Sequence, residues 1–228
     1  MYKKIFKNIN LSNYSFLMRT SLIFIVLIKV IYGISSLKSN NLIKTHNLIK
    51  KKNFNTLNAK TKYSIPALIT PMKSDFSIDY NKFEQLVNYY LDKSDGLTIL
   101  GSTGEWTSIN DSERNKLIKI ASKAINGKIP LIVGTGDINT DKTIQNCLES
   151  EKYGADINLI ISPFYTRPSQ WGIIENYNFI TKQTNLPIII YDCPSRTNSE
   201  MEISTIEFLS FNDQIIGIKD ATGNIQKL

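Results

Sequence analysis

The chain has 228 residues, with 27 Lys and Arg against 20 Asp and Glu and a single His, for a formal net charge of +7. Residues 1–62 carry 12 of these bases and no acid, so the other residues, with 15 bases against 20 acids, give no reason to expect nucleic-acid binding. His46 lies in the basic segment, which excludes Ser-His-Asp, Cys-His and His-rich zinc sites from the remainder. Two cysteines cannot build a zinc cluster or a disulfide framework, so we expect no metal and no cofactor.

Residues 1–62 are predicted to be a targeting leader and not part of the fold. Basic residues precede an apolar run, residues 22–34, that Lys29 interrupts, and small residues follow it, as in a secretory signal. Residues 37–62 are rich in Lys, Asn and Ser, which is typical of a transit peptide. The two together predict import into an organelle such as a secondary plastid. The alternatives are a membrane-anchored chain, and a cytoplasmic one whose leader has no targeting value.

From residue 63 onward, short apolar runs alternate with longer amphipathic segments. The apolar runs show little alternation, which favours parallel strands buried on both faces. They cover residues 64–70, 96–100, 130–134, 157–161, 187–191 and 215–219. Helices are expected between them, from Asp79 to Tyr90, from Asn110 to about Ile125, from Thr140 to Tyr153, from about Trp171 to Gln183, and from Ser204. Residues 110–113 and 204–207 have the spacing of a capping box.

This order of elements indicates βαβ units, which fit either a doubly wound sheet or a (β/α)8 TIM barrel. Every predicted strand is followed by unusual polar sequence, whereas a doubly wound sheet would concentrate such motifs at one switch point. We therefore predict an incomplete (β/α)8 barrel over residues 63–228, with about six βα units.

Lys219 ends the last predicted strand and is the pivotal candidate. Burial lowers the pKa of an amine, and a neutral amine can form a Schiff base with a ketone. The alternative is a lysine at an exposed strand end that pairs with Asp220 or Glu105. Tyr191 ends the preceding strand, where its phenol could move protons beside the amine or simply cap the core.

Two further strand ends, and the loop after Tyr191, carry candidate residues. Ser102 and Thr103 lie between Gly101 and Gly104, in a turn that could hold a small carboxylate or be no more than a tight turn. In the predicted loops, Arg196 could bind a carboxylate bidentately, and Tyr165 could join the site, although surface positions would explain both. An amine, phenols, hydroxyls and an arginine at one barrel end suit imine chemistry on a keto acid.

From about residue 63 to the end, the chain resembles the dihydrodipicolinate synthase family of pyruvate-dependent class I aldolases. The matching segments occur in family order, at residues 67–71, 101–105, 134–136, 163–170, 191–197 and 217–223. The resemblance implies a lyase that condenses pyruvate with L-aspartate 4-semialdehyde to 4-hydroxy-tetrahydrodipicolinate, in lysine biosynthesis by the diaminopimelate route. There are two alternatives. One is a sister aldolase that acts on N-acetylneuraminate or a 2-keto-3-deoxy sugar acid, and the other is a non-catalytic fragment.

The resemblance also implies a role for each residue. Lys219 would form the imine, and Thr103, Tyr165 and Tyr191 would form a proton relay. Ser102 and Thr103 would hold the carboxylate of pyruvate, and Arg196 that of the semialdehyde. The family's tyrosine at the place of Tyr165 crosses a dimer interface, so a homo-oligomer, a dimer of dimers, is expected if the full barrel is present.

This sequence departs from the family pattern in several places. Asp192 replaces a usual Asn and adds a negative charge near Arg196 and Tyr191, and Phe164 replaces a frequent Tyr, which puts lysine feedback in doubt. The sequence also stops after the sixth predicted strand, whereas the family has two more. We expect a truncated product or partial gene model, or a second polypeptide that supplies the rest.

Overall fold

The structure, a computed structural model, describes residues 63–227. The leader predicted over residues 1–62 lies outside the described residues, so its signal and transit segments stay predictions, as does the boundary at residue 63. Within residues 63–227, no helix combines the length and the apolar character that crossing a bilayer requires.

Parallel strands form one sheet, and their order in the sheet is their order in the chain. A doubly wound sheet reverses its strand order at a switch point, whereas a barrel adds each strand next to the preceding one. The sheet is therefore an arc of a (β/α)8 barrel, which confirms the predicted fold class. The strands are β1 (Leu97–Ile99), β2 (Leu131–Gly134), β3 (Ile157–Ile161), β4 (Ile188–Asp192) and β5 (Ile215–Asp220).

The strand predicted over residues 64–70 is wrong as a regular element. The segment makes a single parallel bridge, Ala67 to Thr98 of β1. Around it, the Leu68 N–H donates to the Thr98 carbonyl at 2.8 Å, and the Thr98 N–H donates to the Pro66 carbonyl at 2.9 Å. Pro66 has no N–H to donate toward β1, so the ladder does not continue on that side of the bridge. The segment still lies beside β1, where the first strand of a barrel belongs.

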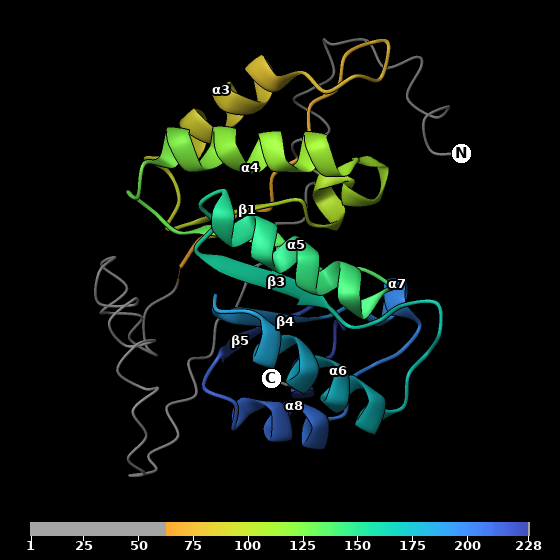
Figure 1. Ribbon diagram of the computed structural model, residues 1–228. Helices are drawn as coiled ribbons and strands as arrows, with labels where there is room; N and C mark the ends of the chain where they lie inside the picture. The colour runs from red at the N-terminus through yellow and green to blue at the C-terminus, as the bar shows by residue number, and fades with distance from the viewer. Residues whose placement is uncertain (1–62, 228) are drawn as a thin grey trace.

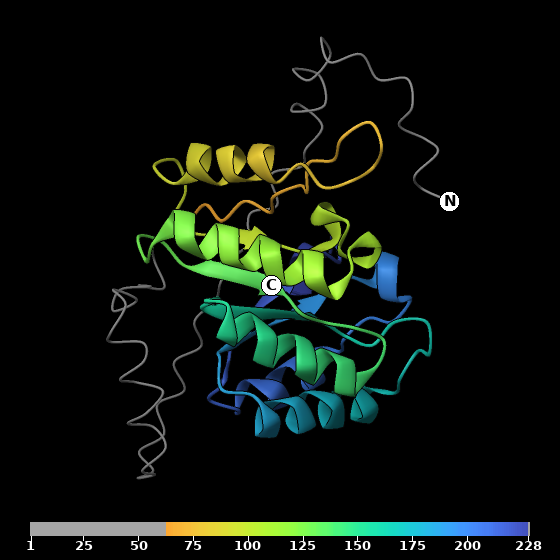
Figure 2. The same cartoon turned by 45° about the horizontal axis from the view of Figure 1, so that its top comes forward.

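Helices follow the strands and cover one face of the sheet, where α4, α5, α6 and α8 lie side by side (Figures 1 and 2). The longer helices are α3 (Tyr80–Tyr90), α4 (Asp111–Ile125), α5 (Thr140–Lys152), α6 (Gln170–Gln183) and α8 (Ile203–Ser210). The short ones are α7 (Pro194–Thr197) and the 3-10 helices η3 (Ser102–Gly104), η4 (Trp106–Ser108) and η5 (Ile225–Lys227).

Side-chain caps explain where the helices begin. Asp79 caps α3, and Asn110 and Glu113 form the predicted capping box of α4, in which each side chain accepts from the other's backbone N–H. The second predicted capping box is wrong. Helix α8 begins at Ile203 with Glu202 as its N-cap, so Ser204 already lies in the first turn.

Alternate residues of the strands pack into two layers. Ile160, Ile188 and Ile190 contact the helices, whereas Leu159, Ile189 and Tyr191 belong to a separate cluster on the inner face of the arc. The residue after Tyr191, Asp192, therefore faces the helices. This alternation determines which strand-end side chains can meet in a site.

Candidate active site

Lys219 and Tyr191 meet at the carboxyl end of the sheet. They are register partners on β5 and β4, and the Lys219 nitrogen lies 4.2 Å from the centre of the Tyr191 ring. Both side chains are buried, with Lys219 only 8% exposed. The alternative of a lysine at an exposed strand end is therefore wrong.

The surroundings of Lys219 disfavour its charged form. Burial lowers the pKa of the amine, and the positive charge of Arg196 lowers it further, against an opposing contribution from Cys193. A lowered pKa increases the share of neutral amine at neutral pH, which is the form that attacks a carbonyl carbon.

Tyr191 keeps its proton at neutral pH. Burial raises the pKa of the phenol to about 12, and a hydrogen bond with Cys193 adds to the rise, whereas Ser102 and Arg196 oppose it. The phenol is therefore available as a proton donor next to the amine.

Cys193 is the site residue that we missed in the sequence. Its side chain is buried in the inner cluster with Tyr191, and it influences both the phenol and Lys219. The available signal was its position two residues after Tyr191, because alternate residues of an extended segment share a face.

The glycine-flanked turn after β1 is confirmed as a tight turn. Gly101 is buried, and the Gly104 N–H donates to the Gly101 carbonyl at 3.0 Å, which closes the short helix η3. Ser102 is half-buried and reaches Tyr191, whereas Thr103 is exposed. The turn therefore brings a hydroxyl to the phenol.

Arg196 lies on α7, directly after β4, and not in the loop that we predicted. Its side chain is exposed, and its charge lowers the pKa of both Tyr191 and Lys219. A cation at the edge of a buried amine site is well placed to attract an anionic substrate.

Tyr165 is not brought into the site by the described residues. It lies in the connection from β3 to α6 with a positive φ of 71°, and its side chain is 87% exposed. Its neighbour Phe164 packs instead against Trp106, with ring centres 6.0 Å apart. The relay of Thr103, Tyr165 and Tyr191 is therefore not assembled within residues 63–227.

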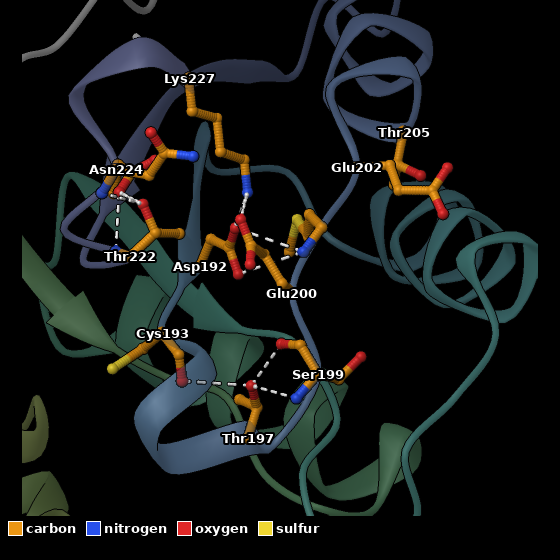
Figure 3. Close-up of polar contacts among 12 residues, drawn as sticks. Asp192, Cys193, Thr197, Ser199, Glu200, Glu202, Thr205, Thr222, Asn224 and Lys227 are labelled. Atoms are coloured by element: carbon orange, nitrogen blue, oxygen red, sulfur yellow. Dashed lines mark hydrogen bonds and ion pairs between the residues drawn. The ribbon is translucent and has the colours of Figure 1, made fainter.

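Asp192 does not add its charge to the site, contrary to our expectation. Figure 3 shows its carboxylate directed toward Lys227, with Cys193 pointing the other way. The Lys227 nitrogen lies 2.6 Å from Asp192 Oδ2 and 3.1 Å from Glu200 Oε1. Burial raises the pKa of Asp192 even though Lys227 opposes that rise. The strand alternation that turns Tyr191 inward turns Asp192 outward.

Comparison with known proteins places these features in a family. The family model described as "Dihydrodipicolinate synthetase family" matches residues 60–228. The chain is 39% identical over 176 residues to 4-hydroxy-tetrahydrodipicolinate synthase of Ligilactobacillus salivarius, which covers 75% of this chain and 61% of that protein. It is 38% identical over 166 residues to the Coxiella burnetii enzyme of that name, covering 72% and 57%.

Solved structures that the chain resembles carry the name of this family. A dihydrodipicolinate synthase from Aquifex aeolicus aligns with a TM-score of 0.70 at 32% identity, over 73% of this chain and 57% of that one. The Acinetobacter baumannii enzyme aligns with a TM-score of 0.71 at 33% identity, over 72% and 57%. The chain thus spans a little over half the length of the relatives that it matches. Together with the strand order and the strand-end site, these matches show that the chain belongs to the dihydrodipicolinate synthetase family.

Proposed function

We propose that this protein condenses pyruvate with L-aspartate 4-semialdehyde through an imine on Lys219, and so makes 4-hydroxy-tetrahydrodipicolinate for lysine biosynthesis. The observation that carries the proposal is a buried amine with a lowered pKa, 4.2 Å from the ring of a protonated phenol. The names of the curated relatives support the reaction, and the Acinetobacter baumannii structure was determined with pyruvate bound.

The reaction begins when the neutral Lys219 amine attacks the keto carbon of pyruvate. Tyr191 donates a proton as the resulting carbinolamine loses water, and the imine then loses a methyl proton to give an enamine. The enamine carbon attacks the aldehyde carbon of the semialdehyde and forms the new C–C bond. The amino group of the adduct then attacks the imine carbon, which closes the ring and releases Lys219.

The remaining site residues would bind the two carboxylates. The turn that contains Gly101, Ser102 and Thr103 would hold the carboxylate of pyruvate beside Lys219. Arg196 would bind the carboxylate of the semialdehyde, because a guanidinium can grip a carboxylate with two hydrogen bonds.

Assembly and location are also part of the proposal. The 87% exposure of the Tyr165 side chain supports a role across an interface between copies, where it would complete the relay with Thr103 and Tyr191. The acid-free composition of residues 1–62 supports import into an organelle.

Borohydride reduction in the presence of pyruvate tests the proposal. We expect one reduced pyruvyl group on Lys219, found by peptide mass spectrometry, and none in the Lys219→Met variant. Turnover is then compared between aspartate semialdehyde and sugar aldehydes. A folded protein that pyruvate and borohydride leave unmodified would contradict the imine, and a preference for sugar aldehydes would contradict the acceptor.

A further inference from the structure

The η3 turn is held from two sides by residues that belong to neither the imine nor the relay. On one side, the Thr70 hydroxyl donates to the Gly104 carbonyl at 2.8 Å. Thr70 is itself buried, at 6% exposed, at the end of the segment that runs beside β1. A hydroxyl at the end of the neighbouring segment therefore fixes the last carbonyl of the turn.

On the other side, the turn rests against the backbone of Gly134, the last residue of β2. A Cβ on Gly134 would lie 2.2 Å from the Leu100 carbonyl oxygen and 3.1 Å from the Gly101 nitrogen. Real Cβ atoms do not approach a backbone oxygen this closely, so only glycine allows the contact. Leu100 also has a positive φ of 56°, a conformation that a leucine adopts only where its surroundings hold it there.

Gly134 is fixed in turn by Arg114 of α4. The guanidinium of Arg114 donates to the Gly134 carbonyl at 2.5 Å, and its side chain is buried, at 4% exposed. Burial lowers the pKa of Arg114 to about 10, so it stays charged at neutral pH and donates strongly. Arg114 lies on the helix that follows the turn in the chain, so this hydrogen bond ties that helix to the end of β2.

We propose that Thr70 and Gly134 are positioning residues that set the η3 turn to receive the carboxylate of a small keto acid, with Arg114 holding Gly134 in place. The inference rests on the proposed function and goes further, because it names residues that touch neither substrate nor amine. A carboxylate site built from backbone N–H groups depends on the orientation of those groups. Thr70 and Gly134 are the contacts that determine it.

The test uses variants of the full chain. Thr70→Val removes the hydroxyl at almost constant volume, Thr70→Ser restores it, and Gly134→Ala adds the methyl group that the turn cannot accommodate. Gly172→Ala is the matched control, because a Cβ there would lie 3.4 Å from its nearest neighbours, in ordinary contact. The rate of hydrogen exchange in residues 101–108 measures how firmly the turn is held. Borohydride trapping at varied pyruvate concentration measures how well the site binds pyruvate.

Thr70→Val and Gly134→Ala are expected to speed exchange in residues 101–108. Thr70→Val should also raise the pyruvate concentration for half-maximal trapping about two- to tenfold, the effect of one lost hydrogen bond, with the maximal extent unchanged. Gly134→Ala should raise that concentration as well, because its methyl group displaces the turn. Thr70→Ser and Gly172→Ala should behave as wild type. Wild-type exchange in Thr70→Val, or a Thr70→Ser variant no better than Thr70→Val, would overturn the inference. If Gly134→Ala does not fold, the Thr70 pair decides.

Failure of the proposed function would look different. A wild-type chain that pyruvate and borohydride leave unmodified would disprove the imine. Exchange in residues 101–108 would then decide by itself whether Thr70 and Gly134 position the turn.

Discussion

Lys219 and Tyr191 face each other across β5 and β4, with the lysine nitrogen 4.2 Å from the centre of the tyrosine ring. The hydrogen-bond ladder between β4 and β5 holds both backbones, so the sheet sets the separation of the two residues. Positioning of this kind removes part of the entropic cost of bringing reacting groups together.

Replacing Lys219 by Met should remove imine formation and stabilise the fold. The folded chain holds the lysine pKa below its usual value, so between the two pKa values the unfolded chain binds a proton that the folded chain does not. The free energy of unfolding of the wild type therefore rises with pH between the folded and the unfolded pKa of Lys219. In urea unfolding, the variant should have the higher free energy of unfolding at pH 7, and its difference from wild type should be smaller at pH 9. A gap that does not change with pH would contradict the lowered pKa.

Replacing Tyr191 by Phe should keep the ring over Lys219 and remove only the proton donor. The rate of imine formation in single-turnover trapping should then fall about 10²- to 10⁴-fold. Tyr177→Phe is the control, because Tyr177 is another buried tyrosine, which donates to the Ile160 carbonyl at 2.7 Å among the helices. That change should cost about 1 kcal/mol of stability and leave trapping unchanged. Equal rates in Tyr191→Phe and wild type would exclude the phenol as donor.

Periodicity was enough to predict most of the fold. The strands β1 to β5 and the helices α3 to α6 occur where apolar spacing and caps placed them. The failures have local causes. Pro66 interrupts a ladder that apolar spacing alone suggests, and α8 begins one residue before Ser204, without a side-chain cap.

The site was predictable only to the extent that strand ends meet. Lys219 and Tyr191 follow from that rule, because consecutive parallel strands bring their carboxyl ends together. The role of Gly134 does not, since it depends on a backbone contact with Leu100 that no local pattern encodes. The outward direction of Asp192 follows from strand alternation, which we did not apply to it.

Replacing Cys193 by Ala should lower the pKa of Tyr191 part of the way toward its usual value. The hydrogen bond with Cys193 would be lost, while burial, the larger cause of the raised pKa, remains. Tyrosinate absorbance, taken as the difference from a Tyr191→Phe background, measures the change. Cys147→Ala is the control, because the Cys147 thiol contacts Thr135 at 3.3 Å on the helix side of the sheet. A Tyr191 pKa that does not move would show that Cys193 only fills space.

Replacing Asp192 by Asn should destabilise the fold without affecting the imine. Lys227 would lose the negative charge of the partner at 2.6 Å, where only a neutral amide oxygen remains, and would keep Glu200 at 3.1 Å. Burial already disfavours the Asp192 charge. The free energy of unfolding should therefore fall by about 1–2 kcal/mol, less than when most buried ion pairs are broken. Glu200→Gln removes the half-exposed partner and should cost less than about 1 kcal/mol.

The pH dependence of the free energy of unfolding is a second test of the ion pair between Lys227 and Asp192. Burial by itself would lower the pKa of Lys227, but its bonds to Asp192 and Glu200 outweigh burial and raise it. A base with a raised folded-state pKa stabilises the fold fully below its unfolded value of about 10.4, and that stability is lost as pH rises through the folded value. Urea unfolding at alkaline pH should therefore show a steeper loss in wild type than in Asp192→Asn. Parallel curves, or a variant that traps less pyruvate than wild type, would contradict this assignment.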